Sequence, residues 1–229
     1  MDTAARLHRI AVAAADEVGD GMLLGLGTGA TAGAVIRELG SRVGRGLRIA
    51  GVPTSRGTAA LAGAVGIPLR SLDEVDRIDL GIDGADEIDP ELNLIKGGGA
   101  ALLVEKLVAL ACDDYLVVAA AEKRSPALGT RFRLPVEVVP IGWGHTAERL
   151  RRLGFGLEPE LRVSGGDPVC TDTGHLLLDC ATAPIADPAA LGAAVKAVTG
   201  VVDHGLFVGL TRRVLLVEAD GTLVGLSPR

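Results

Sequence analysis

Aromatic side chains are scarce in this sequence. Only 2% of its 229 residues are aromatic: one tryptophan, one tyrosine and three phenylalanines. Proteins bind single-stranded nucleic acid largely by stacking bases on such side chains, so this scarcity argues against it as the main partner. The net charge of −6 points the same way, because no basic patch broad enough to follow a phosphate backbone is evident. The sequence predicts no nucleic-acid partner, and we expect any phosphorylated ligand to be small and held locally.

Cysteine and histidine are few, and long hydrophobic runs are absent from the sequence. The three cysteines show no CxxC spacing, which is typical of free thiols in a reducing compartment. The four histidines form no HExxH or other paired metal-ligand motif. Apolar stretches such as residues 115–121 are far too short to span a bilayer. The start of the chain is amphipathic and too acidic for a signal peptide, so we expect a cytoplasmic protein without membrane contact.

The first half of the chain alternates helix-like and strand-like segments. Continuous apolar strands that alternate with helices predict a mostly parallel sheet covered by helices on both faces, as in a Rossmann-like α/β domain. We expect helices over residues 3–18, 30–40, 55–65 and 99–112, and strands over residues 22–25, 47–52, 67–69, 77–82 and 115–119.

The pattern changes after about residue 129. Strand, helix, strand, strand and helix follow one another, which predicts a smaller α+β (ferredoxin-like) domain, and Asp187 is the expected N-cap of its last helix. The end of the chain reads as strands at 205–208 and 214–219, with a hairpin turn at Asp220–Gly221, and we expect it to return to the first sheet. The predicted domains are residues 1–129 with 201–229, forming the Rossmann-like catalytic domain, and residues 130–200, forming the small domain.

A glycine-rich turn follows the first predicted strand and opens a predicted helix. Glycines let the backbone approach a ligand, and a helix N-terminus offers amides and a positive dipole end to an anion. The segment also fits a loose GxGxxA dinucleotide pattern, but residues 51–55 carry none of the acids that would bind a ribose. A small phosphate ligand is favoured over NAD, with a merely structural turn as the alternative. The residues concerned are Gly27, Thr28, Gly29, Ala30 and Thr31.

Residues 73–91 carry nine acids in nineteen positions. They fail the EF-hand register and have no histidine nearby, so a divalent metal site is only an alternative reading. Asp83 and Asp86 stand ahead of Lys96, and this group of carboxylates and a cation could transfer protons.

Three glycines, Gly97, Gly98 and Gly99, then open a helix-like run that carries Glu105. Successive glycine amides can stabilise a developing oxyanion. Apolar neighbours would desolvate Glu105 and raise its pKa toward that of a useful base. The alternative, which these residues alone leave open, is a surface glutamate on an amphipathic helix.

Taken together, these segments resemble the type A family of ribose-5-phosphate isomerases. The matches run in family order across nearly the whole chain. They comprise GTGATA at 27–32, VPTS at 52–55, DGADEID at 83–89, KGGGAA at 96–101 with Glu105, LPVEV at 134–138, Thr171–Asp172 with Asp179, and GLF at 205–207.

The resemblance implies interconversion of ribose 5-phosphate and ribulose 5-phosphate without a cofactor. It implies that Glu105 moves a proton between C2 and C1 through an enediolate, and that Asp83 assists ring opening. Asp86 and Lys96, with the glycine amides, would position and stabilise the reacting oxygens, and the Gly27–Thr31 turn and Lys123 would hold the phosphate. A homodimer or homotetramer is expected from the resemblance as well, with the small domain in the oligomer contacts.

The sequence departs from the family pattern around the expected phosphate site. Ala30 stands where the family usually has a serine, and the usual acid and serine ahead of Lys123 are replaced, although Arg124 could share the role of that lysine. No equivalent of a phosphate-facing lysine near the N-terminus can be assigned among Arg6, His8 and Arg9. Two rival functions fit the same scaffold: an amino-sugar-phosphate isomerase or deaminase, and a sugar-phosphate-sensing domain of a transcription regulator.

Overall fold

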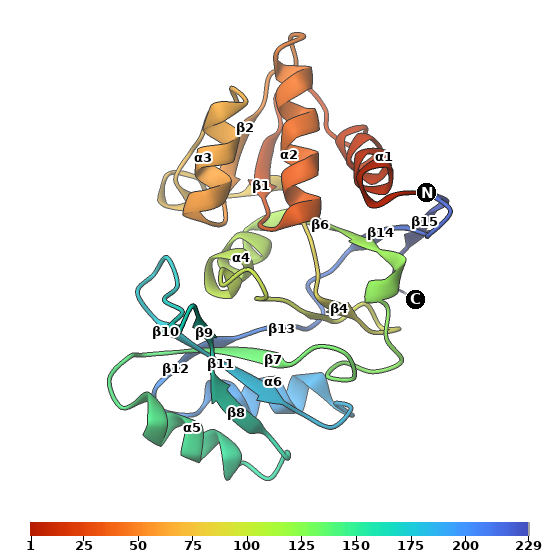
Figure 1. The fold of residues 1–229 in the computed structure, drawn as a ribbon. Helices are drawn as coiled ribbons and strands as arrows, with labels where there is room; N and C mark the ends of the chain where they lie inside the picture. The colour runs from red at the N-terminus through yellow and green to blue at the C-terminus, as the bar shows by residue number, and fades with distance from the viewer. Residues whose placement is uncertain (229) are drawn as a thin grey trace. The chain divides into compact units, whose positions relative to one another are not determined.

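A computed structural model describes residues 1–228 of the chain (Figure 1). Contacts within the chain divide it into two compact units. The first unit comprises Met1–Ala85, Val104–Lys123 and Leu210–Arg229, and the second comprises Asp86–Leu103 and Arg124–Gly209.

The first unit is built on a six-stranded sheet. All neighbouring strands pair in parallel except the last two, β14 and β15, which are antiparallel. This confirms the predicted α/β fold with a mostly parallel sheet. The strand order is β15 (Leu223–Leu226), β14 (Arg213–Val217), β6 (Cys112–Ala120), β3 (Ile78–Asp83), β1 (Leu23–Leu26) and β2 (Ala50–Pro53).

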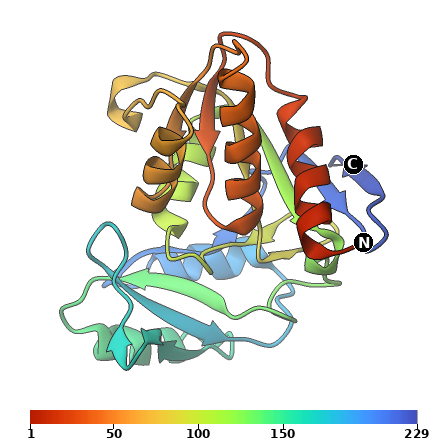
Figure 2. The same cartoon turned by 45° about the horizontal axis from the view of Figure 1, so that its top comes forward.

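Helices cover both faces of this sheet. Figures 1 and 2 show α1, α2 and α3 over one face and α4 over the other. No helix in residues 1–228 has the length and apolar character needed to cross a membrane. The helices are α1 (Thr3–Ala15), α2 (Ala30–Val43), α3 (Arg56–Ala64) and α4 (Leu102–Leu110), with short 3-10 turns η1 (Leu72–Glu74) and η2 (Ala121–Lys123).

Strand alternation assigns each face of the sheet its own residues. Leu24 and Leu80 belong to the core under α1, α2 and α3. Successive side chains of a strand point to opposite faces, so the next residues, Gly25 and Gly81, face α4. A Cβ placed on Gly25 would lie 2.7 Å from Cγ1 of Val108 in α4. The missing side chain therefore lets α4 pack directly on the strands.

The second unit contains a four-stranded antiparallel sheet with two helices. Its elements follow one another as strand, helix, strand, strand, helix, strand, with a small β-hairpin inserted before the third strand. The spatial order 4-1-3-2 of the four strands is that of a ferredoxin-like domain and matches the predicted α+β domain. The elements are β7 (Leu134–Val138), α5 (Trp143–Arg151), β8 (Glu158–Leu161), the hairpin β9 (Val163–Ser164) and β10 (Asp167–Pro168), β11 (Leu176–Ala181), α6 (Pro188–Lys196) and β12 (Val201–His204).

The second unit also holds a three-stranded sheet that the sequence did not predict. It joins β4 (Glu87–Ile88), β5 (Leu94–Ile95) and β13 (Leu206–Phe207). Strands of two residues carry too little periodicity to be recognised in a sequence. As a result, residues 86–103, 124–129 and 201–209 group with the second unit, whereas the sequence placed them in the catalytic domain.

Two other details of the prediction differ from the structure. Residues 67–69 form only an isolated bridge, Leu69 to Gly51, rather than a strand. The segment at 205–208 pairs with β5 and does not return to the first sheet. The following segment does return: β14 pairs with β6, and the Glu218 amide closes the predicted hairpin by donating to the Thr222 carbonyl at 2.8 Å. Asp187 caps α6 as predicted, accepting a hydrogen bond from the Ala190 amide at 2.9 Å.

The face of β7 opposite its helices carries a buried glutamate. Glu137 is 1% exposed, and its Oε1 lies within hydrogen-bond distance of three groups. Thr171 and Thr173 donate their hydroxyls at 2.9 and 2.7 Å, and Nδ1 of His175 lies at 2.9 Å. A buried carboxylate is tolerated when its oxygens are hydrogen-bonded. The LPVEV motif, which contains Glu137, and the Thr171–Asp172 motif therefore have a structural explanation.

Candidate active site

The loop between β1 and α2 passes very close to the end of β3. A Cβ on Gly27 would lie 2.2 Å from Oδ1 of Asp83 and 2.6 Å from its Cα, so only glycine fits there. The amide of the next residue, Thr28, donates to Oδ1 of Asp83 at 3.1 Å. The predicted glycine turn and the first predicted carboxylate are therefore in direct contact.

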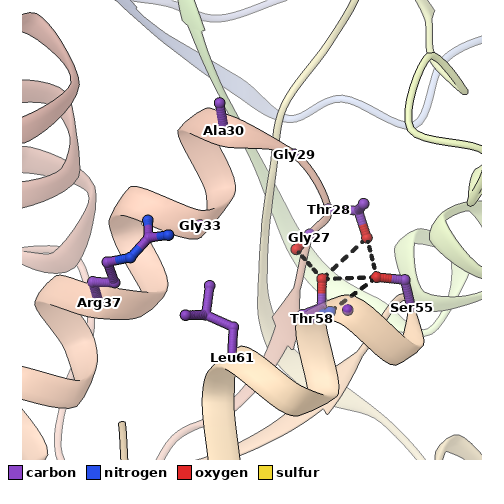
Figure 3. Close-up of a pocket in the computed structure, with 10 residues that line it drawn as sticks. Gly27, Thr28, Gly29, Ala30, Gly33, Arg37, Ser55, Thr58 and Leu61 are labelled. Carbon is purple, nitrogen blue, oxygen red and sulfur yellow. Dashed lines mark hydrogen bonds between the residues drawn. The ribbon is translucent and has the colours of Figure 1, made fainter. Parts of the chain in front are cut away.

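A cavity of about 220 Å³ opens beside this loop, between α2 and α3 (Figure 3). Gly29, with a φ of 108°, is the N-cap of α2, and its carbonyl accepts the first helical hydrogen bond from the Gly33 amide. The amides of the first turn of a helix lack helical partners, so they suit an anion. The cavity is lined by Gly27, Thr28, Gly29, Ala30, Gly33, Arg37, Ser55, Gly57, Thr58 and Leu61.

Hydroxyl groups from three segments join in one network beside the loop. Thr28 Oγ1 lies 2.8 Å from Thr54 Oγ1, 2.9 Å from Ser55 Oγ and 3.1 Å from Thr58 Oγ1. The hydroxyl of Thr58 also donates to the Gly27 carbonyl at 2.9 Å, which pins the turn. Figure 3 shows Thr28, Ser55 and Thr58 pointing toward one another.

Sequence reasoning included only part of this cavity. It named Gly27, Thr28, Gly29 and Ala30, which line it, and Thr31, which is not among the lining residues. It missed Arg37 on α2 and the residues of α3. The N-cap position of Ser55 was a usable signal, because an N-capping serine at the start of a helix places its hydroxyl beside the adjacent strand end.

Asp83 is buried and held by several donors. It is 1% exposed, and its Oδ1 accepts from the amides of Thr28 and Gly84, the latter at 2.7 Å. Its Oδ2 accepts from the Tyr115 hydroxyl at 3.2 Å. Burial first, and then the negative charges of Asp83 and Glu105, hold the pKa of Tyr115 well above its usual range. The phenol therefore stays protonated and can donate.

Glu105 is buried on α4, so the alternative of a surface glutamate is wrong. It is 3% exposed, and Val108, one turn later, packs against Val52 and Ile78 of the sheet. Residues three apart share a helix face, so Glu105 faces the same side of the sheet as Val108. The negative charge of Glu105, after burial and the charge of Asp83, contributes to the raised pKa of Tyr115.

The second unit holds the remaining predicted catalytic residues. Lys96 is 2% exposed, and its Nζ lies 5.6 Å from the centroid of the Phe207 ring, a cation–π distance. The Gly98 amide donates to Oδ2 of Asp86 at 2.8 Å. One of the three expected glycine amides is thus engaged with a carboxylate, and Gly97, with a φ of 111°, provides the bend of the loop.

A half-buried ion pair supports this glycine loop. Arg162 donates from Nε and Nη2 to the two carboxylate oxygens of Asp179 at 2.8 and 2.5 Å, a bidentate pair. Its Nη1 also donates to the carbonyls of Gly97 and Gly98 at 2.8 and 3.3 Å. Sequence reasoning quoted Asp179 but not Arg162, which no local pattern distinguishes from the other arginines.

Lys123 lies in η2, directly after β6, and is not among the residues that line the cavity of Figure 3. Its neighbour Glu122 forms an ion pair with Arg6 of α1 at 2.6 Å, and Arg6 also donates to the Val217 carbonyl. The glutamate that departs from the family pattern is therefore tied to the N-terminal helix.

Most acids of the 73–91 segment have structural partners. Asp79 accepts from the Leu23 amide at 2.8 Å, and Glu74 closes a capping box with Ser71. Glu87, 0% exposed, accepts from two backbone amides, those of Gly129 and Arg131. Within residues 1–228 no three His, Cys, Asp or Glu side chains gather into a group that could hold a metal ion.

This geometry defines an α/β protein that can hold a small anion at a helix N-terminus, next to a buried carboxylate suited to proton transfer. Comparison with known proteins gives the family. The family described as ribose 5-phosphate isomerase A (phosphoriboisomerase A) matches residues 50–221. The ribose-5-phosphate isomerase A of Caulobacter vibrioides is 52% identical over 220 residues, which cover 94% of this chain and 95% of that protein. That of Bradyrhizobium diazoefficiens is 48% identical over 226 residues, with coverage of 95% and 93%.

Solved structures give the same result. The ribose 5-phosphate isomerase of Plasmodium falciparum superposes with a TM-score of 0.94 at 36% identity, covering 97% of this chain and 98% of that one. A D-ribose-5-phosphate isomerase in complex with phospho-erythronic acid reaches a TM-score of 0.95 at 35% identity, with coverage of 99% and 100%. The chain belongs to the ribose 5-phosphate isomerase A family.

The contact between Gly27 and Asp83 predicts a strong effect of a single methyl group. We expect Gly27→Ala to lower the free energy of unfolding by about 2 kcal/mol or more, because the new Cβ forces β3 and the loop apart. Gly57→Ala is the matched control: its Cβ would meet only Ser55 Oγ at 3.8 Å, on an exposed helical position. Helix propensity should then stabilise this variant by about 0.5 kcal/mol. Urea unfolding measures both, and equal stabilities would contradict the close approach.

Proposed function

We propose that this protein is a cytoplasmic, cofactor-independent isomerase that interconverts D-ribose 5-phosphate and D-ribulose 5-phosphate. The observation that carries the proposal is the pair of buried carboxylates, Asp83 and Glu105, on one face of the first sheet. Thr28 links Asp83 to a cavity that suits an anion, because it lines that cavity and its amide donates a hydrogen bond to Asp83. Membership of the isomerase family and the phospho-erythronic acid complex of a relative support the same substrate class.

Glu105 is the proposed base. An aldose–ketose shift removes a proton from C2, forms an enediolate and returns a proton to C1, so one carboxylate can accept and then donate. Glu105 meets this requirement as a carboxylate that is 3% exposed, on a helix that packs on the sheet through Val108.

Asp83, Lys96 and Asp86 are proposed to act on the sugar oxygens and on the charge that develops there. Asp83 acts on the sugar ring oxygens in ring opening. Lys96 stabilises the developing negative charge of the enediolate, and Asp86 positions the reacting oxygens together with the amides of the Gly97–Gly99 loop. Each well-placed donor of this kind is worth about 3–4 kcal/mol of barrier in other enzymes.

The phosphate takes no part in the bond changes and serves as an anchor. Amides at the start of α2 and the hydroxyl network of Thr28, Ser55 and Thr58 form the proposed binding site. Lys123 remains part of the proposal as a charge that attracts the phosphate. Binding energy from this distant group can then be used to orient the reacting carbons.

The decisive experiment compares wild-type protein with Glu105→Gln. Chelator-treated wild type should isomerise ribose 5-phosphate, whereas Glu105→Gln should lose about 10²- to 10⁴-fold in kcat because the base is gone. Its unfolding curve should stay close to that of wild type, since the two side chains have the same shape. Glu91→Gln, the same change at an exposed glutamate, is the control and should keep full activity. Near-wild-type turnover of Glu105→Gln would disprove the base assignment, and an inactive wild type would disprove the proposed reaction.

Ala30 offers a gain-of-function test of the phosphate site. It lines the cavity where the family usually has a serine. Ala30→Ser should lower the KM for ribose 5-phosphate about fivefold with little change in kcat, because one added hydrogen bond contributes about 1 kcal/mol. Ala60→Ser is the control: it makes the same change at an exposed position of α3 that does not line the cavity. An unchanged KM in Ala30→Ser would place the phosphate elsewhere.

We also propose that the protein is a homodimer or homotetramer joined through its second unit. That unit exposes several large apolar side chains, including Ile141 (87% exposed), Val163 (57%) and Phe155 (44%), and such side chains are typical of interfaces. Light scattering should give the mass of two or four chains, and Ile141→Asp should reduce it. Leu110→Asp, at a 63% exposed position of the first unit, should not. A wild-type monomer, or dissociation by Leu110→Asp alone, would refute the assignment.

A further inference from the structure

The sole tyrosine of the chain contacts the buried carboxylate of Asp83. Tyr115 is 2% exposed on β6, and its hydroxyl donates to Oδ2 of Asp83 at 3.2 Å. The other oxygen of Asp83 accepts the amides of Thr28 and Gly84. The carboxylate is therefore held from both ends, and the tyrosine supplies the hydrogen bond to Oδ2 that limits its rotation about the Cβ–Cγ bond.

The position of the ring is fixed by close packing. Tyr115 is paired with Gly81 on the neighbouring strand β3, and a Cβ on Gly81 would lie 2.6 Å from Cδ2 of the ring. The same Cβ would lie 2.7 Å from Sγ of Cys112, whose thiol donates to the Val108 carbonyl. The absence of a side chain at Gly81 thus makes room for the phenol beside Asp83, two residues further along β3.

The hydroxyl of Tyr115 also keeps the proton that it donates. Burial and the negative charges of Asp83 and Glu105 raise the pKa of Tyr115 well above its usual range. A phenol with a raised pKa keeps its proton throughout the neutral range, so the hydrogen bond to Asp83 persists over the pH range in which an enzyme of this kind operates.

We infer that Tyr115 is a positioning residue for ring opening: it orients the Asp83 carboxylate on the sugar ring and takes no part in the proton transfer by Glu105. The inference rests on the proposed function. Ring opening breaks the bond between C1 and the ring oxygen and moves the O1 proton to that oxygen, leaving the aldehyde. A carboxylate does this by accepting one proton and delivering it a short distance away, so its orientation sets the rate. Ribulose 5-phosphate is acyclic and needs no such step.

Tyr115→Phe separates the two steps. Turnover of cyclic ribose 5-phosphate should fall about tenfold or more in kcat, since a hydrogen bond that orients a charged group is lost. Exchange of the C1 proton of ribulose 5-phosphate in deuterated water, followed by NMR, uses Glu105 as base and involves no ring opening, so its rate should stay within about twofold of wild type. Cys112→Ala, which perturbs packing beside the ring without touching the bond to Asp83, should leave both rates unchanged.

A second measurement tests the contact itself without relying on the stability of the Phe variant. Because the chain has one tyrosine, the near-ultraviolet absorbance of tyrosinate during alkaline titration reports on Tyr115 alone. Wild type should ionise only well above the usual tyrosine range, and Asp83→Asn should lower the midpoint by removing a neighbouring negative charge.

The outcomes are distinct. A selective loss of ribose 5-phosphate turnover, together with the titration shift, supports the inference. An unchanged turnover of Tyr115→Phe, an equal loss in turnover and exchange, or an ordinary tyrosine titration in wild type overturns it. A wild type that isomerises neither sugar overturns the proposed function instead, so the two failures can be told apart.

Discussion

The first unit depends on one carboxylate, that of Asp83. Its oxygens collect hydrogen bonds from the loop before α2, through Thr28, from its own strand end, through Gly84, and from β6, through Tyr115. Three segments far apart in the sequence are therefore fixed relative to one another by a single side chain. The arrangement requires Gly27, because any side chain there would displace Asp83. The same contact places the anion-suited start of α2 at a defined position next to the carboxylate, which is what a reaction on a phosphorylated substrate requires.

Alternate residues of each strand in this unit face opposite sides of the sheet, and the two sides differ in character. One face of the sheet is apolar and packs under α1, α2 and α3. The other face carries Gly25 and Gly81 where a core would normally carry large side chains, and continues into Asp83 at the end of β3. The glycines allow α4 and the ring of Tyr115 to approach the sheet closely. Glu105 lies on that helix, so its burial depends on the close approach that Gly25 allows.

The sequence alone predicted what depends on local pattern. The glycine turn, the helix it opens, the alternation of strands and helices and the α+β order of the second half are all encoded within short windows, and the structure confirms them. Long-range pairing was not accessible in this way. Thr58 joins the loop only because α3 packs next to α2, and Tyr115 reaches Asp83 only because β6 pairs with β3. The acids illustrate the same limit. Glu87 and Asp83 look alike in sequence, yet backbone amides bind both carboxylate oxygens of Glu87, whereas the two amides at Asp83 donate to Oδ1 alone.

The 83–105 segment reads as one motif but is supported by two separate cores. Asp83 and Glu105 belong to the first unit, whereas Lys96 and the glycine loop belong to the second. In the second unit the conformation of the glycine loop depends on Arg162. Its guanidinium donates to loop carbonyls and forms an ion pair with Asp179 of β11. A carbonyl held by a guanidinium fixes the peptide plane, and hence the direction of the next amide, which here points at a carboxylate. The shape of the Gly97–Gly99 loop is thus set by a residue some 65 positions away in the chain. This explains why a local motif can identify the family, whereas a residue that holds the motif in its conformation, such as Arg162, is recognised only in the folded protein.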